Sequence, residues 1–262
     1  MSLLLVTGAQ GFLGRAFVAA ALASGDSVIG YGRSERADDR YTHRISVGGG
    51  SVPALAPPEY VRPLSSHAYE YHRGDLLDTD DLAALLRSKR PRAIVHLAAA
   101  LRDDDFDTLM RTNVKGTMAL FDAVAAAGID VEKIVIGSSA SVYGKPESVP
   151  IPEAARCEPE DFYGVSKLAS ERVAAIRSKK LGTLVCSARI FNVVGAGQDE
   201  RHVCGKLASQ AVAFAGGRAR TLQFGDLRPT RDFVDVRDAA AAIALLVRAG
   251  TGTYNVCSQV ET

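Results

Sequence analysis

Near the start of the chain, residues 7–14 read Thr7-Gly8-Ala9-Gln10-Gly11-Phe12-Leu13-Gly14, with glycines at the spacing G-x-x-G-x-x-G. An apolar run of strand length precedes them, and apolar residues at helical spacing follow as far as Gly25. In that setting Gly8 permits a tight turn, Gly11 lets a diphosphate approach the backbone, and Gly14 lets the helix pack close to the strand. The helix N-terminus, at Phe12 and Leu13, offers unpaired N–H groups to phosphates. We interpret these residues as a dinucleotide-binding loop, with an ordinary turn as the alternative.

Strand and helix patterns alternate downstream of this loop. We expect strands at 27–32, 69–73, 93–97, 133–138 and 183–190, and helices at 78–88, 106–127 and 163–178. Such repeated units favour an α/β fold, a Rossmann-type doubly wound parallel sheet. Residues 42–68 interrupt the alternation with clustered glycines and prolines, and we expect an irregular surface loop there.

The pattern becomes less regular after Ile190. We expect a helix at 203–215, short strands near Thr221 and Asp232, a helix at 236–248 and a strand at 253–256. Residues 1–190 are therefore predicted to form a Rossmann domain that binds NAD(P), and residues 191–262 a small substrate-binding region interleaved with the end of the sheet. Because the sequence stops at Thr262 just after a strand, a truncated C-terminus is expected.

Composition excludes several classes of protein. The chain has 31 Lys plus Arg and 30 Asp plus Glu in 262 residues, a net charge of +1, which argues against a nucleic-acid partner or an anionic membrane surface. A hydrophobic fraction of 47% is ample for a buried core. We find no secretory signal or membrane span and expect a cytoplasmic protein. The four cysteines lack C-x-x-C spacing, so neither disulfides nor a metal site are expected.

The end of the second predicted strand bears on the choice of nucleotide. An acid there would bind an adenosine ribose, whereas an arginine would pair with a 2′-phosphate. The sequence is Gly30-Tyr31-Gly32-Arg33-Ser34, without an acid, so NADP is modestly favoured over NAD. The alternative is that Arg33 is an ordinary solvated charge. After the third strand, Asp75 is placed to accept from the adenine amino group and Leu76 to cover the ring, although Asp75 is nearly as consistent with a solvated strand end.

A tyrosine and a lysine start the helix predicted at 163–178. Tyr163 and Lys167 are four residues apart and can share one face. A nearby ammonium stabilises phenolate, so we expect the pKa of Tyr163 to be lowered toward working pH and Tyr163 to be a general base. Such a pair alone is more often structural. Upstream, Gly137-Ser138-Ser139-Ala140-Ser141 lies at the carboxyl end of the fifth strand, where a hydroxyl could bind a reacting oxygen.

In combination, these motifs resemble the extended short-chain dehydrogenase/reductases, especially the nucleotide-sugar epimerases and dehydratases. The resemblance covers essentially the whole chain. It includes further motifs in the expected order: His96-Leu97-Ala98-Ala99, Asn113-Val114-Lys115-Gly116-Thr117, Arg189-Ile190-Phe191-Asn192-Val193 and Arg231-Asp232-Phe233-Val234-Asp235-Val236.

The resemblance implies a role for each matching position. Ser139 corresponds to the hydroxyl that polarises the substrate, Tyr163 to the acid/base, and Lys167 to the residue that binds the nicotinamide ribose and tunes Tyr163. It also implies cofactor contacts at Leu97, Ala98, Ala99 and Asn113, and substrate contacts at Ser141, Asn192 and Arg231. Among these, Asn192 lies where the family contacts the substrate diphosphate and Arg231 where it neutralises a phosphate. His96 is expected to be a packed residue without chemistry, and a homodimer is a family expectation.

The implied activity is nucleotide-sugar epimerisation through a transient keto-sugar, with NAD(P) recycled in place. Family dehydratases carry an acidic pair just after the active-site hydroxyl residue, whereas this chain has Ala140 and Ser141, so 4-epimerisation is favoured over dehydration. The main alternative is an NADPH-dependent keto-sugar reductase, which would suit Arg33. A dinucleotide-binding regulator without turnover is disfavoured, because the chain keeps both Tyr163 and Lys167.

Overall fold

The computed structural model describes residues 2–47, 50–226 and 228–262. Its centre is a seven-stranded sheet in the order β11-β8-β7-β6-β1-β2-β5. Every pairing in this sheet is parallel. The chain builds outward from β1 in one direction and then returns to build on its other side, which confirms the predicted doubly wound sheet. The strands are β1 (Leu3–Thr7), β2 (Ser27–Gly32), β5 (Tyr69–Arg73), β6 (Ala93–His96), β7 (Lys133–Ser139), β8 (Leu184–Ile190) and β11 (Gly252–Val256).

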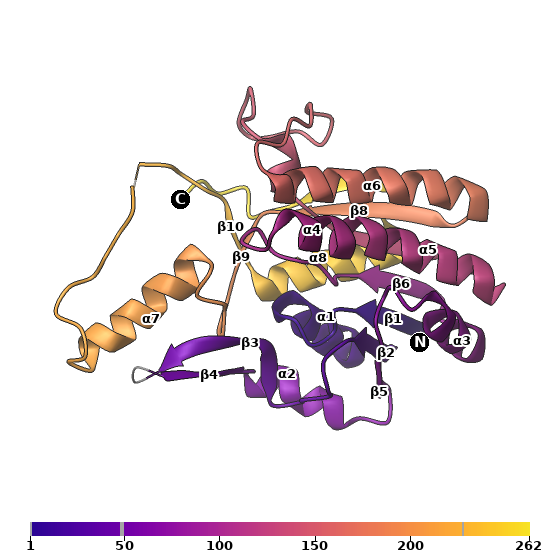
Figure 1. Cartoon of the computed structure of the whole chain (residues 1–262), viewed down its shortest axis with the longest axis horizontal. Helices are drawn as coiled ribbons and strands as arrows, with labels where there is room; N and C mark the ends of the chain where they lie inside the picture. Colours follow the sequence, from indigo (N-terminus) through magenta and orange to yellow (C-terminus); the bar gives the residue numbers. More distant parts are fainter. Residues whose placement is uncertain (1, 48–49, 227) are drawn as a thin grey trace.

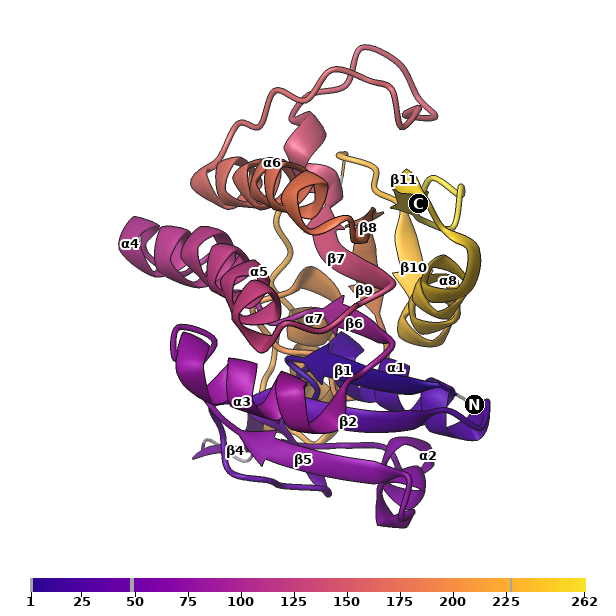
Figure 2. The ribbon, with the colours of Figure 1, turned by 90° about the vertical axis from the view of Figure 1, so that its right-hand side faces the viewer.

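Helices cover both faces of the sheet (Figures 1 and 2). One face carries α3 (Thr79–Lys89), α5 (Gly116–Ala127) and α6 (Phe162–Leu181), and the other carries α1 (Phe12–Ala23) and α8 (Val236–Ala249). Successive strand residues alternate between the two cores, as a pleated strand requires. In β1, Leu5 joins the core that contains Leu120 of α5. Its neighbour Val6 joins the core that contains Phe17 of α1.

The long helix expected at 106–127 is divided into three segments. It comprises α4 (Phe106–Leu109), the π-helical segment η2 (Met110–Lys115) and α5. A π-helical turn widens the helix and leaves backbone carbonyls available to side chains. The carbonyl of Asn113 indeed accepts hydrogen bonds from Thr117 Oγ1 at 2.6 Å and Ser170 Oγ at 2.7 Å. The segment therefore joins α5 to α6 beside the carboxyl end of the sheet.

The prediction of an irregular loop at 42–68 was wrong. The chain forms an antiparallel hairpin of β3 (Arg40–Val47) and β4 (Gly50–Leu55), then α2 (Pro58–Val61) and the 3₁₀ turn η1 (Arg62–Ser65). Gly48 and Gly49 lie outside the described residues. Pro53 has no backbone N–H to donate. It is accommodated in β4 because, in the described residues, this sheet has two strands and no third strand that would need the hydrogen bond.

Residues after 190 continue the main sheet and also add a smaller one. β11 pairs with β8, while β9 (Asn192–Val194) and β10 (Phe233–Asp235) form a separate parallel pair, and α7 (Val203–Ala215), between them in the sequence, contacts β3. The strand predicted near Thr221 is absent, because the Gln210 side chain of α7, rather than another strand, bonds the backbone of Gln223. The division at residue 190 stays a prediction.

In the described part of the chain, no helix combines the length and apolar character that crossing a bilayer requires.

Candidate active site

The glycine loop is shaped by close backbone contacts. Gly8 has φ +71°, which favours glycine, and a Cβ there would lie 2.7 Å from the Ala98 nitrogen. A Cβ at Gly14 would collide with the Gly8 carbonyl. Helix α1 begins at Phe12, directly after the turn, so its first N–H groups have no partners within the helix. The loop therefore presents a glycine cradle and a helix N-terminus to the same space.

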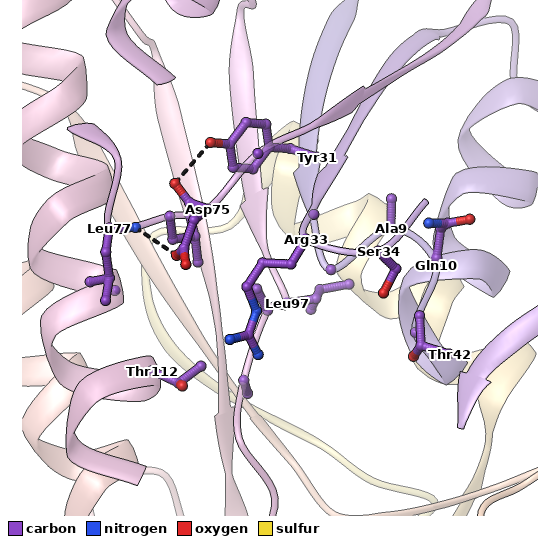
Figure 3. A pocket seen from close by; sticks show the side chains of 18 of the residues that line it. Ala9, Gln10, Tyr31, Arg33, Ser34, Thr42, Asp75, Leu77, Leu97 and Thr112 are labelled. Atoms are coloured by element: carbon purple, nitrogen blue, oxygen red, sulfur yellow. Dashed lines mark hydrogen bonds between the residues drawn. The ribbon is translucent and has the colours of Figure 1, made fainter. Parts of the chain in front are cut away.

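A cavity of about 280 Å³ opens beside this loop, at the carboxyl ends of the strands (Figure 3). Its lining includes eight of the predicted cofactor residues: Gly8, Gly11, Arg33, Asp75, Leu76, Leu97, Ala98 and Ala99. It also includes residues that sequence reasoning did not single out, among them Gln10, Tyr31, Ser34, Thr42, Arg111 and Thr112. Ser34 and Tyr31 adjoin the predicted Arg33 and could have been found by proximity. Arg111 and Thr112, in the π-helical segment, likewise lie within two residues of the predicted Asn113, whereas Thr42, in the hairpin, carried no signal.

Arg33 extends along the cavity, toward Leu97 and Thr112 in Figure 3. Its side chain is exposed. The next acid along the chain, Glu35, bonds Arg73 at 2.6 Å and does not line the cavity. The lining at the end of β2 therefore carries a guanidinium and no carboxylate.

Asp75 lies on the cavity wall with its carboxylate partly satisfied. Its Oδ1 accepts from the Leu77 nitrogen at 3.0 Å, and its carbonyl accepts from the Tyr31 hydroxyl at 3.0 Å, the two bonds drawn in Figure 3. The same hydroxyl is 3.1 Å from Asp81 Oδ2. These bonds fix the turn after β5. Asp75 is therefore held in place by the contacts of this turn with β2 and, through the Tyr31 hydroxyl, with α3.

Other predicted cofactor residues lie outside the cavity lining. Phe12 and Leu13 pack their side chains against the core on the α1 face, so only their backbone N–H groups are suited to a phosphate. Asn113 is buried and bonds Ala100 and Ser166 instead: its Oδ1 accepts from the Ala100 nitrogen at 2.8 Å, and its Nδ2 donates to Ser166 Oγ at 2.9 Å. Asn113 thus holds the loop after β6 against α6.

The catalytic residues expected from the motifs meet at the carboxyl end of β7. Ser139 ends β7 and its Oγ is 3.1 Å from Ser141 Oγ in the short turn η3 (Ala140–Tyr143). Asp161 caps α6 by accepting from the Gly164 nitrogen at 2.7 Å, which sets Tyr163 in the first helical turn. Lys167 Nζ lies 5.8 Å from the centre of the Tyr163 ring. The structure therefore brings the hydroxyl, the phenol and the amine together.

The expected lowering of the pKa of Tyr163 by Lys167 was wrong. Burial raises the pKa of Tyr163 above its ordinary value, and the Ser139 hydroxyl and the Arg102 charge only partly oppose this. The ammonium is engaged elsewhere, because Lys167 Nζ donates to the Gly137 carbonyl at 2.6 Å. Burial also lowers the pKa of Lys167 to about 8, against a smaller opposing effect of Glu171.

Arg102 is a residue of this centre that sequence reasoning missed. It lies in the loop between β6 and α4, where its Nη2 donates to Ser141 Oγ at 2.7 Å and its Nη1 is 2.7 Å from Asp161 Oδ2. A single arginine after a strand belongs to no motif, so only the folded loop reveals its position.

The predicted substrate residues Asn192 and Arg231 lie close together on the small sheet. Asn192 begins β9 and its Nδ2 donates to the Asp232 carbonyl at 2.9 Å, and Arg231 precedes Asp232. Both side chains are exposed, and neither lines the cavity at the glycine loop. Asn192 lies two residues beyond the end of β8, whose Ile190 pairs with Ser139.

His96 is a packed residue, as expected. Its Nδ1 is 2.8 Å from Thr7 Oγ1, its Nε2 is 3.2 Å from Thr117 Oγ1, and burial lowers its pKa to about 3. No cluster of three or more His, Cys, Asp or Glu side chains suited to a metal ion occurs among residues 2–47, 50–226 and 228–262.

The residues present fit a dinucleotide. The glycine cradle leaves no room for a Cβ at Gly8 or Gly14, the helix N-terminus has unpaired donors, and the cavity continues from this cradle to Arg33 and Asp75. Gly137 links the cavity to the chemical centre, because it accepts from Lys167 and packs against Leu97 of the lining.

Comparisons with known proteins agree with this arrangement. The model of the NAD dependent epimerase/dehydratase family matches residues 4–257. The chain is 35% identical to a UDP-glucose 4-epimerase of Mycolicibacterium smegmatis, covering 98% of this chain and 78% of that protein. It is 36% identical to a GDP-6-deoxy-D-mannose reductase of Pseudomonas aeruginosa over 72% of this chain and 65% of that protein.

Among solved structures, Thermus thermophilus UDP-glucose 4-epimerase in complex with NAD superposes with a TM-score of 0.77 at 28% identity, covering 99% of this chain and 79% of the other. The family model and the two epimerase matches extend over nearly all of the chain and include both the glycine loop and the Tyr-Lys helix. The chain is therefore a member of the NAD dependent epimerase/dehydratase family, an enzyme of the short-chain dehydrogenase/reductase superfamily.

Proposed function

We propose that this protein catalyses the 4-epimerisation of a nucleotide sugar through a transient keto-sugar, with NAD(P) bound throughout the cycle. The observation that carries the proposal is the position of Tyr163, whose ring lies 5.8 Å from Lys167 Nζ while its hydroxyl interacts with Ser139. This group adjoins the cavity that fits the dinucleotide through Gly137 and Leu97.

The chain's own residues divide the work of the reaction. Tyr163 accepts the proton of the sugar hydroxyl and later returns it, Ser139 donates a hydrogen bond to the same oxygen, and Lys167 binds the nicotinamide ribose. A dinucleotide held by the glycine loop and Lys167 would supply the chemistry of hydride acceptance from the sugar carbon and of hydride return to the opposite face of that carbon. Because proton and hydride both return to the sugar, the net reaction consumes no reductant.

The substrate diphosphate is assigned to the small sheet. Asn192 is exposed at the start of β9 and Arg231 is exposed two residues before β10. A guanidinium suits a diphosphate because it can form paired, charge-assisted hydrogen bonds. Ser141, held by Arg102 beside Ser139, is placed to contact the sugar.

NADP is proposed as the preferred dinucleotide. Support comes from Arg33, which is exposed in the cavity wall at the end of β2, where the described lining has no carboxylate. The relative from Thermus thermophilus was solved with NAD, and the preference proposed here rests on this chain's own β2 end.

Keto-sugar reduction is the second proposal. It is supported by the same Arg33, because a reductase exchanges its cofactor at every turnover, and by the similarity to the Pseudomonas reductase. Dehydration has less support, because Ala140 and Ser141 occupy the positions where an acidic pair would stand.

Incubation with UDP-glucose or UDP-galactose separates these activities. Epimer formation measured by NMR, with no net change in NAD(P)H absorbance, is the expected result. Stoichiometric oxidation of NADPH with a keto-sugar would instead establish the reductase. Tyr163→Phe is the matched control: it should abolish turnover yet leave cofactor binding nearly intact, because it removes only the titrating hydroxyl.

A homodimer formed through α4, α5 and α6 is also proposed. Phe106 and Phe162 are exposed and pack edge to face, with ring centres 5.1 Å apart, and Met118 and Val165 are exposed on the same helices. Light scattering should give twice the chain mass, and Phe162→Lys should give the single-chain mass. A cytoplasmic location stays a prediction.

A further inference from the structure

Arg102 bridges two of the elements that form the chemical centre. Its guanidinium contacts Ser141 Oγ in η3 and Asp161 Oδ2 at the N-terminus of α6, both at 2.7 Å. Its Cζ lies 5.9 Å from the centre of the Tyr163 ring, which is within the range where a cation interacts with an aromatic face. The loop between β6 and α4 therefore places a positive charge beside the proposed acid/base.

Lys167 and Arg102 are positive groups of different character. The Lys167 ammonium is buried, donates to the Gly137 carbonyl, and has its pKa lowered to about 8. The Arg102 side chain is 61% exposed, and guanidinium groups remain protonated in proteins. As the solution becomes mildly alkaline, Lys167 loses its charge whereas Arg102 keeps it.

We propose that Arg102 is a second electrostatic and positioning residue of the active site, which stabilises the Tyr163 phenolate and fixes the Ser141 hydroxyl toward the substrate. The proposal rests on the proposed role of Tyr163 as acid/base. The polar and charged groups that surround Tyr163 in the described structure are Ser139 at the end of β7, Arg102 before α4, Asp161 before α6 and Lys167 within α6.

Asp161 provides a test of opposite sign. It pairs with Arg102 and raises the pKa of Tyr163, whereas Arg102 lowers it. Arg102→Gln removes the cation, and Asp161→Asn removes the anion but keeps a side chain that can cap α6 equally well. If Arg102 acts through charge, the two variants must shift the phenol in opposite directions. A loss of packing alone would not shift the pKa of Tyr163 in opposite directions in the two variants.

The measurement is the pKa of Tyr163 in the protein saturated with NADP, from the ¹³Cζ resonance of labelled tyrosine, assigned with Tyr163→Phe. Arg102→Gln should raise this pKa by about 0.5 to 1 unit, because the lost cation is near but partly solvated. Asp161→Asn should lower it by a similar amount. Arg102→Lys, which keeps a charge but not the paired geometry, should give an intermediate value.

Two outcomes would overturn the proposal. One is a shift of the same sign in both variants, and the other is a shift below about 0.2 units in both, which is too small for a charge at this distance. If Arg102→Gln does not fold, Asp161→Asn and Arg102→Lys still decide the sign. The titration needs no substrate, so it remains valid if epimerase activity is not found.

Where the protein is active, kcat/KM adds a second readout. In Arg102→Gln, the acidic limb of the pH profile of kcat/KM should move to higher pH by the same amount as the pKa of Tyr163. At the acidic end of the profile, kcat/KM should therefore fall about threefold to tenfold. The Ser141 contact should appear separately, as a rise in KM in Ser141→Ala with an unchanged acidic limb. A moved limb in Ser141→Ala would assign the effect to the hydroxyl and contradict the role of Arg102.

Discussion

Tyr163 is the residue on which the proposed chemistry depends, and its ionisation is opposed by its own burial. Burial disfavours the phenolate, and the Ser139 hydroxyl and Arg102 favour it. The spacing Tyr-x-x-x-Lys predicts that two side chains share a helix face. It cannot predict that the lysine bonds a strand carbonyl, because that depends on where β7 ends.

Arg33 is expected to select the nucleotide. Arg33→Gln should weaken NADP binding about tenfold, because it removes charge-assisted hydrogen bonds to the 2′-phosphate. It should leave NAD binding nearly unchanged, which isothermal titration calorimetry can measure for both dinucleotides. Arg36→Gln is the control, since Arg36 lies near the same strand end but pairs with Asp38 and does not line the cavity. Equal affinities for the two nucleotides in the unmodified protein would contradict the assignment.

Lys167 is expected to make the stability of the cofactor-free protein depend on pH. Its pKa is lowered from 10.5 to about 8 by burial, so between these values the unfolded chain binds a proton that the folded chain has released. The free energy of unfolding should therefore rise with pH across this window, by up to about 3 kcal/mol.

Urea denaturation of the unmodified protein and of Lys167→Met, at about pH 7 and about pH 10, isolates this contribution. The unmodified protein should gain stability relative to the variant as the pH rises. If the difference in unfolding free energy between the two proteins were the same at both pH values, burial would not lower the pKa of the Lys167 amine.

The residues that sequence alone identified share a local signal. Gly8, Gly11 and Gly14 meet a requirement of one turn, and the serines of 138–141 lie at the carboxyl end of one strand. Arg102 and Thr42 have no such signal, because the loop after β6 that carries Arg102 and the hairpin that carries Thr42 are both positioned by contacts distant in sequence. Asn113 differs from them, because the family motif assigns it to the cofactor, whereas its side chain bonds Ala100 and Ser166, partners that the motif does not reveal.

At the scale of elements, a buried ion pair joins α6 to β8. Arg189 Nε and Nη2 donate to the two oxygens of Glu171 at 3.0 and 2.9 Å, and both side chains are less than a tenth exposed. Ser138 Oγ donates to the same carboxylate, and Arg189 Nη1 also donates to the Glu153 carbonyl. The pair therefore fixes the helix of Tyr163 against the strand that leads to Asn192.

Arg189→Met should destabilise the protein by about 3 kcal/mol or more, because it leaves the Glu171 carboxylate buried without its cation. Adding Glu171→Gln should recover part of this loss, since the amide removes the charge but still accepts from Ser138. Chemical denaturation of the single and double variants measures both. Equal stability of the single and double variants would show that water hydrates the Glu171 carboxylate once Arg189 is removed.

The β3–β4 hairpin is held to the segment after β9 by a small set of bonds. Glu200 accepts from the Ser46 nitrogen and from Ser46 Oγ, both at 2.8 Å, and His43 Nε2 is 2.6 Å from the Gly197 carbonyl. Glu200→Ala should raise amide hydrogen exchange in β3 about fivefold to tenfold, the equivalent of one or two lost bonds, with little change in global stability. Unchanged exchange in β3 would locate the restraint elsewhere, and Glu261→Ala, at the chain end, is a matched surface control.

The hairpin was not predicted because its sequence resembles a loop. Clustered glycines and Pro53 are typical of turns, and the alternation of apolar residues in 40–55 is weak. Its fold depends on partners more than a hundred residues away, such as Gly197 and Glu200, which no local pattern contains.

For the whole molecule, the order of the sheet was predictable because the rules for parallel strands leave few alternatives. Right-handed crossovers and buried apolar strands fix the layers once the alternation is recognised. The chain returns to add β11 beside β8, which places residues 252–256 in the same sheet as β1, the strand that precedes the glycine loop. The site itself is then divided between the carboxyl ends of strands far apart in sequence, such as β1 and β7.

The hairpin also connects the two proposed ligand sites. Thr42 lines the dinucleotide cavity, while its neighbours Tyr41 and His43 contact the carbonyls of Ala196 and Gly197, just beyond β9. A dinucleotide that orders Thr42 therefore reduces the conformational entropy that residues 196–197 still have to lose when a sugar nucleotide arrives. We therefore expect a sugar nucleotide to bind more tightly to the protein that already holds the dinucleotide than to the empty protein.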